Sequence, residues 1–213
     1  GRAGHVAGLI GQHHWNTHLA LGSFKPYLRP FKEWREGGIK AMRDGLSADK
    51  KIVALTADIS SFYHELDPEF MLNEKFISRL AITFNEEQQK LNRLFIRAIQ
   101  AWALHTPSRK GIPVGLPASA VIANLALIEL DRAIEREIAP LYYGRYVDDI
   151  LLVMENGANI KSQQDLWRFL IARSNGNLDW TEDKKGIRYH ASYLRKSNLE
   201  FSNEKNKVFL LSG

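Results

Sequence analysis

The sequence predicts an α/β (α+β) fold in which a small antiparallel sheet is backed by helices. Residues 52–57 form a short, apolar, β-prone run that ends at Asp58, which is typical of a buried strand. Residues 141–147 and 150–154 are two more apolar runs, separated only by Asp148 and Asp149, and this spacing is typical of a β-hairpin. Two helical segments, at 85–104 and 119–139, supply the second layer of the fold.

The N-terminal segment, residues 1–25, is rich in glycine and histidine. His14 and His18 are four residues apart, so a helix would place both on one face, where they could hold a metal ion. No glutamate accompanies them in the pattern of a zinc-protease helix. With His5 and His13, they are better explained as surface imidazoles that touch a partner or RNA.

The segment from residue 31 to 46 is loosely amphipathic and is interrupted by Gly37 and Gly38, so it predicts two short helical pieces. Residues 47–51 are a polar turn before the first strand.

The helix at 85–104 has the strongest pattern, with Asn85 as N-cap and apolar residues at helical spacing. A Gly/Pro loop at 106–117 leads into the helix at 119–139, which Pro140 stops. Residues 155–190 are weakly patterned apart from a short helix at 166–171. Residues 199–211 are strand-like around a Ser-Asn-Glu-Lys turn.

The composition excludes several classes of protein. The chain has 213 residues, 45% hydrophobic and 25% charged, enough for one domain or one body divided into subdomains. It has no cysteine, which excludes a disulfide framework and a thiolate zinc site and makes the cytoplasm the expected location. No apolar run approaches the roughly 20 residues of a membrane span, so no membrane association is expected. The net charge of +5 permits a polyanionic partner without requiring one.

The aspartates that end the predicted strands carry the chemical information. Buried carboxylates are costly unless they are paired or bind metal, and hard carboxylate oxygens suit Mg²⁺. Two such ions about 4 Å apart stabilise the attacking and leaving oxygens of a phosphoryl displacement. On a strand, Asp148 and Asp149 would point to opposite faces, whereas a turn lets both reach the same pocket as Asp58. Taken alone, each site could also be an ordinary turn or cap.

Four segments, in a fixed order, favour a metal site over an ordinary turn or cap. They are Asp58-Ile59-Ser60-Ser61-Phe62-Tyr63, the loop from Gly111 through Pro113, Val114 and Gly115 to Ser119, Tyr146-Val147-Asp148-Asp149, and Asn203-Glu204-Lys205. They resemble the three central palm motifs of reverse transcriptases and the fourth, lysine-bearing motif. The resemblance covers residues 50–211, and the three-motif set is highly specific.

The resemblance implies a role for each matching residue. Asp58 and Asp148 match the metal ligands, assisted by the backbone carbonyl of Ile59, with Asp149 as the accompanying carboxylate. The implied cofactor is Mg²⁺, as two ions, with Mn²⁺ as a substitute. Lys205 matches the lysine proposed to protonate the leaving pyrophosphate, although it could also be a solvated turn lysine.

The substrate side of the resemblance comprises Ser61, Phe62, Tyr63, Val114 and Gly115. Tyr63 matches the aromatic gate that would collide with a 2′-hydroxyl, which favours deoxynucleotides over ribonucleotides. An aromatic that merely packs the palm is the alternative for Tyr63. Gly115 would let the loop pass close to template and nucleotide.

The sequence departs from the wider family at two places. Val114 stands where glutamine is usual, and Ala120 where a proline is usual; residues 111–115 and 145–149 look most like the bacterial abortive-infection and defence-associated branch. The chain also stops just after the fourth motif, where a thumb would begin, so we expect that the thumb lies outside this sequence or that a partner replaces it.

The resemblance implies a division into a palm and fingers. Residues 1–50 are expected to form an N-terminal extension and part of the fingers, 51–66 the first palm segment, 67–110 the rest of the fingers, and 111–213 the remaining palm.

The implied function is metal-dependent DNA synthesis in a bacterial anti-phage system, on a dedicated RNA template. Nucleic acid and deoxynucleoside triphosphates are the expected partners, with a homo-oligomer or a sister subunit in addition. Untemplated or protein-primed DNA synthesis at the same site is one alternative. A catalytically silent, RNA-binding palm subunit is another, and the intact Asp58, Asp148 and Asp149 argue against it.

Overall fold

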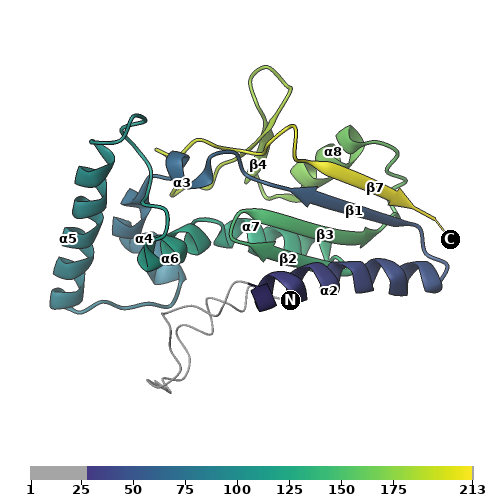
Figure 1. Cartoon of the computed structure of the whole chain (residues 1–213), viewed down its shortest axis with the longest axis horizontal. Helices are drawn as coiled ribbons and strands as arrows, with labels where there is room; N and C mark the ends of the chain where they lie inside the picture. Colours follow the sequence, from purple (N-terminus) through teal and green to yellow (C-terminus); the bar gives the residue numbers. More distant parts are fainter. Residues whose placement is uncertain (1–27, 213) are drawn as a thin grey trace.

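The computed structural model describes residues 28–212 (Figure 1). The histidines His5, His13, His14 and His18 lie outside the described residues. A four-stranded antiparallel sheet runs through the centre in the order β2-β3-β1-β7. Its strands are β1 (Ile52–Ala57), β2 (Tyr142–Tyr146), β3 (Asp149–Glu155) and β7 (Lys207–Leu211). Helices cover the sheet, so the predicted α+β fold with a small antiparallel sheet is confirmed.

Strand β1 is apolar at every position except Thr56 because both of its faces are covered. Val53, Leu55 and Ala57 point into the main core, whereas Ile52 and Ala54 pack in a second, smaller cluster on the opposite face. A strand covered on both faces loses the alternation of apolar and polar residues, which explains the continuous apolar run in the sequence.

Helix α2 (Leu28–Ser47) lies along the face formed by the smaller cluster (Figure 1). The prediction of two short pieces was wrong, because the helix continues through Gly37 and Gly38. A Cβ atom on Gly37 would lie 2.6 Å from the ring of Tyr142, and one on Gly38 would collide with a methyl group of Leu151. The two glycines therefore let the helix approach the sheet closely and do not break it.

The main core lies on the other face of the sheet, beneath α7 (Ile128–Ala133) and α8 (Gln163–Arg173). Helix α5 (Glu86–Ala103) confirms the predicted helix, and its N-terminus carries a capping box between Asn85 and Gln88. Helix α8 confirms the short helix predicted at 166–171 and extends it in both directions.

The prediction of a single helix at 119–139 was wrong. The structure has α6 (Pro117–Ala126), then α7, then one π-helical turn, η2 (Ile134–Ile138). The first break follows Ala126, whose carbonyl oxygen accepts hydrogen bonds from the hydroxyls of Tyr193 (2.8 Å) and Tyr189 (3.1 Å). These tertiary contacts occupy a carbonyl that an uninterrupted helix would use internally.

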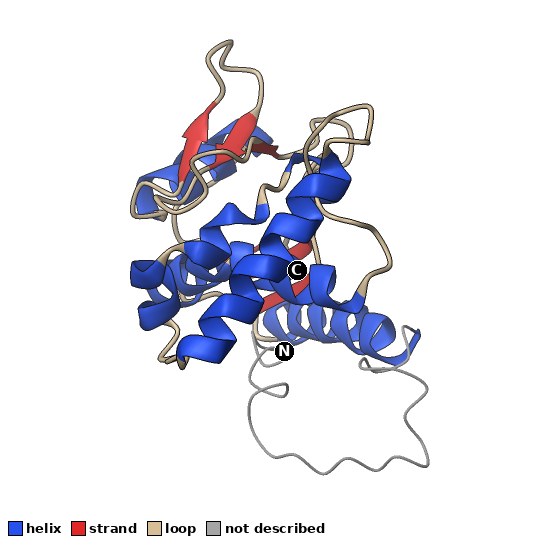
Figure 2. Cartoon of the chain, turned by 90° about the vertical axis from the view of Figure 1, so that its left-hand side faces the viewer, coloured by secondary structure: helices blue, strands red, loops and turns tan. Residues whose placement is uncertain are grey.

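A second sheet was not predicted. It comprises β4 (Leu178–Trp180), β5 (Ile187–Tyr189) and β6 (Leu199–Glu200), strands of two or three residues that are too short to show a period. Figure 2 shows this small sheet at the top of the molecule, beside the stacked helices. The remaining elements are α3 (Phe62–Glu65), η1 (Pro68–Leu72) and α4 (Glu74–Arg79). Among the described residues, no helix combines the length and the apolar character needed to cross a membrane.

Candidate active site

The hairpin of β2 and β3 carries two of the predicted aspartates, with a register that differs from the prediction. Tyr146 pairs with Asp149, so the two turn residues are Val147 and Asp148, and Asp149 is the first residue of β3. Val147 has a φ of 58°. A two-residue hairpin turn requires positive φ, and a β-branched residue adopts it only at a cost in energy. The aspartates therefore occupy one turn position and one strand position.

The central sheet brings Asp58 to the same place. Asp58 directly follows β1, and the last residue of β1, Ala57, pairs with Ile150 next to Asp149. Asp58, Asp148 and Asp149 each offer a carboxylate oxygen within 4.8 Å of the others, and all three residues are half-buried. The three predicted carboxylates thus form one cluster, which we call the aspartate cluster.

Lys205 also reaches this cluster, from the turn before β7. Its Nζ atom donates a hydrogen bond to Oδ2 of Asp58 at 3.0 Å. The Lys205 side chain is 67% exposed, whereas that of Asp58 is 13% exposed. The lysine therefore stands at the solvent side of the carboxylates, with its charge directed at them.

The electrostatics of the cluster favour a bound cation. Burial, followed by the charges of Asp58 and Asp149, raises the pKa of Asp148 to about 6. Burial and the charge of Asp58 also raise the pKa of Asp149. Three carboxylates lie close together, and the pKa values of Asp148 and Asp149 are raised, so a cation placed between them would be stabilised. Their hard oxygen atoms are the donors that Mg²⁺ and Mn²⁺ take in proteins. The donor set therefore fits divalent metal ions.

The segment after Asp58 sets the positions of two aromatic side chains. Ser61 has a φ of 50° and precedes α3. The ring of Phe62 is buried in the main core, so its side chain is not available to a substrate. Tyr63 is half-buried, and its pKa is raised by burial and then by the charge of Asp148. Of the two rings, Tyr63 is the one that lies beside the aspartate cluster.

The Gly/Pro loop is anchored on the same segment. The N–H of Ile112 donates to the carbonyl of Tyr63 at 2.8 Å, and a Cβ atom on Gly111 would lie 2.7 Å from that carbonyl. Beyond this anchor, Val114 is 69% exposed, and Gly115 has a φ of 85° with open space around it. The loop therefore leads from Tyr63 to an exposed, apolar tip.

Sequence reasoning missed a buried ion pair behind the hairpin. The side chain of Arg145 is 7% exposed and that of Asp131 is 4% exposed, and Nη2 of Arg145 lies 2.7 Å from Oδ2 of Asp131. The sequence does indicate such a pair, because Arg145 lies inside the apolar run at 141–147 and a charge buried in such a run must have a partner.

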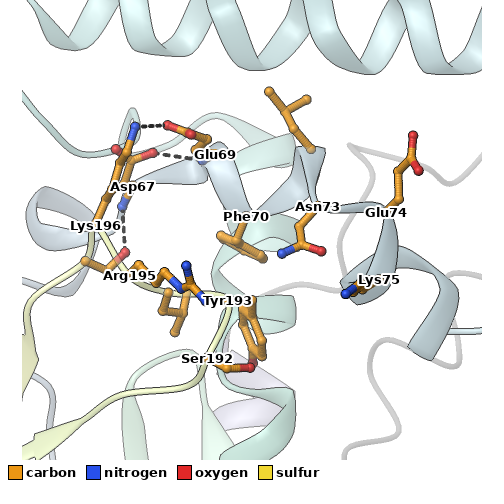
Figure 3. A pocket seen from close by; sticks show the side chains of 13 residues that line it. Asp67, Glu69, Phe70, Asn73, Glu74, Lys75, Ser192, Tyr193, Arg195 and Lys196 are labelled. Carbon is orange, nitrogen blue, oxygen red and sulfur yellow. Dashed lines mark hydrogen bonds and ion pairs between the residues drawn. The ribbon is translucent and has the colours of Figure 1, made fainter.

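A cavity of about 650 Å³ lies elsewhere, between η1, α4 and residues 192–197 (Figure 3). Two polar contacts lie within its lining. Lys196 forms an ion pair with Glu69, and the backbone N–H of Asp67 donates a hydrogen bond to Oγ of Ser197. None of the three clustered aspartates lines this cavity. The chemistry of the aspartate cluster is therefore separate from it.

The raised pKa of Asp148 predicts how the stability of the metal-free protein changes with pH. Between the ordinary carboxyl pKa of 3.8 and about 6, the folded state binds a proton that the unfolded state has lost. The free energy of unfolding should therefore fall as pH rises through this range. After a discount for partial exposure to solvent, we expect a loss of about 1–2 kcal/mol.

Asp148→Asn should remove this loss. Chemical denaturation in a chelator at pH 4.5 and pH 7.5 measures it, with wild type and the variant side by side. The same pH dependence in both proteins would show that Asp148 is not the group responsible.

Comparison with known protein families matches residues 28–211 to the family described as reverse transcriptase (RNA-dependent DNA polymerase). A search of curated proteins found no match. The matched region includes the aspartate cluster, Lys205 and the Gly/Pro loop, and enzymes of this family use divalent metal ions. Because the match covers most of the chain, the chain belongs to the reverse transcriptase family. It is therefore an RNA-directed DNA polymerase that binds nucleic acid and deoxynucleoside triphosphates.

Proposed function

We propose that this enzyme extends DNA on a dedicated RNA template, as part of a bacterial anti-phage defence system in the cytoplasm. The observation that carries the catalytic part is the aspartate cluster, with three carboxylate oxygens within 4.8 Å of one another on neighbouring strands. Asp58, Asp148 and Asp149, with the backbone carbonyl of Ile59, would hold two Mg²⁺ ions, and Mn²⁺ would substitute for them. When bound, these ions supply positive charge to the attacking and leaving oxygens.

The chain's own residues supply the rest of the chemistry. The 3′-hydroxyl of the DNA end loses its proton to solvent, and its oxygen forms a bond to the α-phosphorus of the nucleotide. The bond from that phosphorus to the pyrophosphate oxygen breaks. Lys205 donates a proton to the departing pyrophosphate. Two features of Lys205 support this role. Its hydrogen bond to Asp58 places it at the aspartate cluster, and its exposed side chain has room to turn toward a bound triphosphate.

Tyr63 would lie beneath the sugar of the incoming nucleotide and exclude a 2′-hydroxyl. Its position beside Asp148 supports this role. Ser61 would contribute through its backbone, and the exposed tip at Val114 and Gly115 would face the template and the nascent pair.

The origin of the sheet strands supports the proposed division into palm and fingers. All four strands of the central sheet come from the two proposed palm segments, residues 51–66 and 111–213. Within the proposed fingers segment at 67–110, α5 packs against η1, and Nδ2 of Asn92 donates to the carbonyl of Met71 at 2.8 Å. From residues 1–50, the described helix α2 lies against the sheet.

The proposal of a dedicated RNA rests on the apolar loop tip and on the resemblance to the defence-associated branch. Valine at position 114 offers no hydrogen bond to the nascent pair, so templating would depend on shape and on a tightly held RNA or a sister subunit. Generic primer–template should bind weakly and lose affinity steeply as salt rises.

The test is to incubate the full-length protein with each labelled nucleotide, with and without its co-purifying RNA, and to sequence the DNA. We expect a restricted product that depends on the co-purifying RNA. Faithful copying of arbitrary RNA templates without any partner would contradict the dedicated template. Product that is independent of RNA, or DNA attached covalently to protein, would instead indicate the untemplated or protein-primed alternative. A complete lack of incorporation would favour a silent subunit.

A further inference from the structure

The turn that carries Asp148 needs support from its surroundings. Val147 has a φ of 58°, in the left-handed region that a valine adopts rarely. Such a conformation persists only when neighbouring groups hold it in place. Asp148 is the next residue, so whatever holds Val147 also sets the direction of the Asp148 carboxylate.

Arg145 makes this contact. Its Nη1 atom donates to the carbonyl oxygen of Val147 at 2.6 Å, across the turn. The same guanidinium donates through Nε and Nη2 to the two oxygens of Asp131 on α7, at 2.8 Å and 2.7 Å. Because Arg145 and Asp131 are both buried, water does not compete for these bonds.

Two further groups complete the buried network. The Tyr143 hydroxyl donates to Oδ1 of Asp131 at 2.5 Å. Nη1 of Arg145 also donates to Oδ1 of Asn124 on α6 at 3.0 Å. Helix α6 begins at Pro117, at the end of the Gly/Pro loop. One guanidinium therefore joins the aspartate turn to the helix that follows this loop.

We propose that Arg145 is a positioning residue of the polymerase site, which holds the Val147–Asp148 turn so that the Asp148 carboxylate stays within metal-binding distance of Asp58 and Asp149. This inference rests on the proposed function of the aspartate cluster. The Arg145 guanidinium donates to Asp131, Asn124 and Val147, and it would act on the site through the carbonyl of Val147. Its link to Asn124 fixes the turn relative to the loop that would face the nucleotide.

The geometry requires an arginine. The planar guanidinium has five donors in a fixed fork, which here serve Asp131, Asn124 and Val147 together. A lysine at this position would keep the charge opposite Asp131, but its compact ammonium group cannot reach all three acceptors. Arg145→Lys therefore keeps the charge pair and removes the support of the turn.

The test compares three single variants of the full-length protein. Arg145→Lys removes the fork, and Asn124→Ala removes one acceptor while the pair with Asp131 remains. Arg132→Lys is the control, because Arg132 forms a more exposed pair with Glu129 on the same helix, α7. The measurements are Mn²⁺ affinity by electron paramagnetic resonance, circular dichroism, and kcat and KM for incorporation of a deoxynucleotide.

For folded Arg145→Lys, we expect Mn²⁺ binding to weaken about 10-fold or more and kcat to fall about 10–100-fold, with KM within about two-fold of wild type. Asn124→Ala should shift both Mn²⁺ affinity and kcat in the same direction by about 3–10-fold. Arg132→Lys should leave both unchanged. If a variant lost activity only because less of it was folded, the affinity of its folded fraction for Mn²⁺ would be unchanged.

Wild-type Mn²⁺ affinity and kcat in folded Arg145→Lys would overturn the proposal. If Arg145→Lys fails to fold, Asn124→Ala decides, and unchanged values in that variant would overturn it equally. Failure of the wild-type protein itself to bind Mn²⁺ would instead overturn the proposed metal site, and with it the role of Arg145.

Discussion

Replacing Asp148 and Asp149 together with alanine is expected to reduce DNA synthesis to below about one-thousandth of the wild-type rate while the protein remains folded. Activity is lost because two of the three clustered carboxylates are removed. The fold is retained because burial and the charge of Asp58 raise the pKa values of both side chains, so their removal relieves repulsion and desolvation.

Primer extension with a labelled deoxynucleotide measures the rate, and circular dichroism measures the fold. The matched control is Glu182→Ala with Asp183→Ala, which removes an adjacent acidic pair from the exposed turn between β4 and β5. The control should extend DNA at the wild-type rate. If the Asp148 and Asp149 double variant also does so, the cluster is not the site of synthesis.

Tyr63→Ala is expected to raise the use of ribonucleotides relative to deoxynucleotides by about 10–100-fold. The proposed gate excludes a 2′-hydroxyl by its bulk, and discrimination built on a clash disappears when the clashing group is removed. The half-buried ring beside Asp148 leaves space of its own size when it is truncated.

The ratio of kcat/KM for matched ribonucleotide and deoxynucleotide pairs measures this effect. Tyr63→Phe keeps the ring and removes only the hydroxyl, so it should preserve the wild-type ratio. If Tyr63→Ala also keeps that ratio, Tyr63 is a packing aromatic.

The central part of the fold could be predicted from the sequence because its signals are local. The run at 52–57 is apolar at every position except Thr56, and Asn85 caps a helix with a clear period. The segments at Asp58 and at Asp148-Asp149 each end or begin a strand of one sheet, and pairing of β1 with β3 brings them together. The convergence of the three carboxylates follows from that pairing alone.

The errors arose where tertiary contacts override local patterns. Gly37 and Gly38 read as a helix break, although the close approach of Tyr142 and Leu151 is what requires them. The break after Ala126 depends on hydroxyls from residues far along the chain. No local pattern contains either contact.

The register of the aspartate hairpin and its buried support show the same limit. Valine at 147 gives no sign of a left-handed turn, so the turn seemed to belong to Asp148 and Asp149. The fork of Arg145 onto Asp131, Asn124 and Val147 joins the hairpin to α7 and α6, which the sequence presents separately. The arginine could be noticed in the sequence, but its partners could not be named.

Asp58, Asp148 and Asp149 are expected to bind divalent metal ions together. Titration of Mn²⁺ into the full-length protein at pH 7.5, followed by electron paramagnetic resonance, measures this binding. The wild type and the Glu182→Ala, Asp183→Ala control should bind Mn²⁺ with the same affinity, and the Asp148→Ala, Asp149→Ala variant should bind it at least about 100-fold more weakly. Equal Mn²⁺ affinity in all three proteins would show that the aspartate cluster is not the metal site.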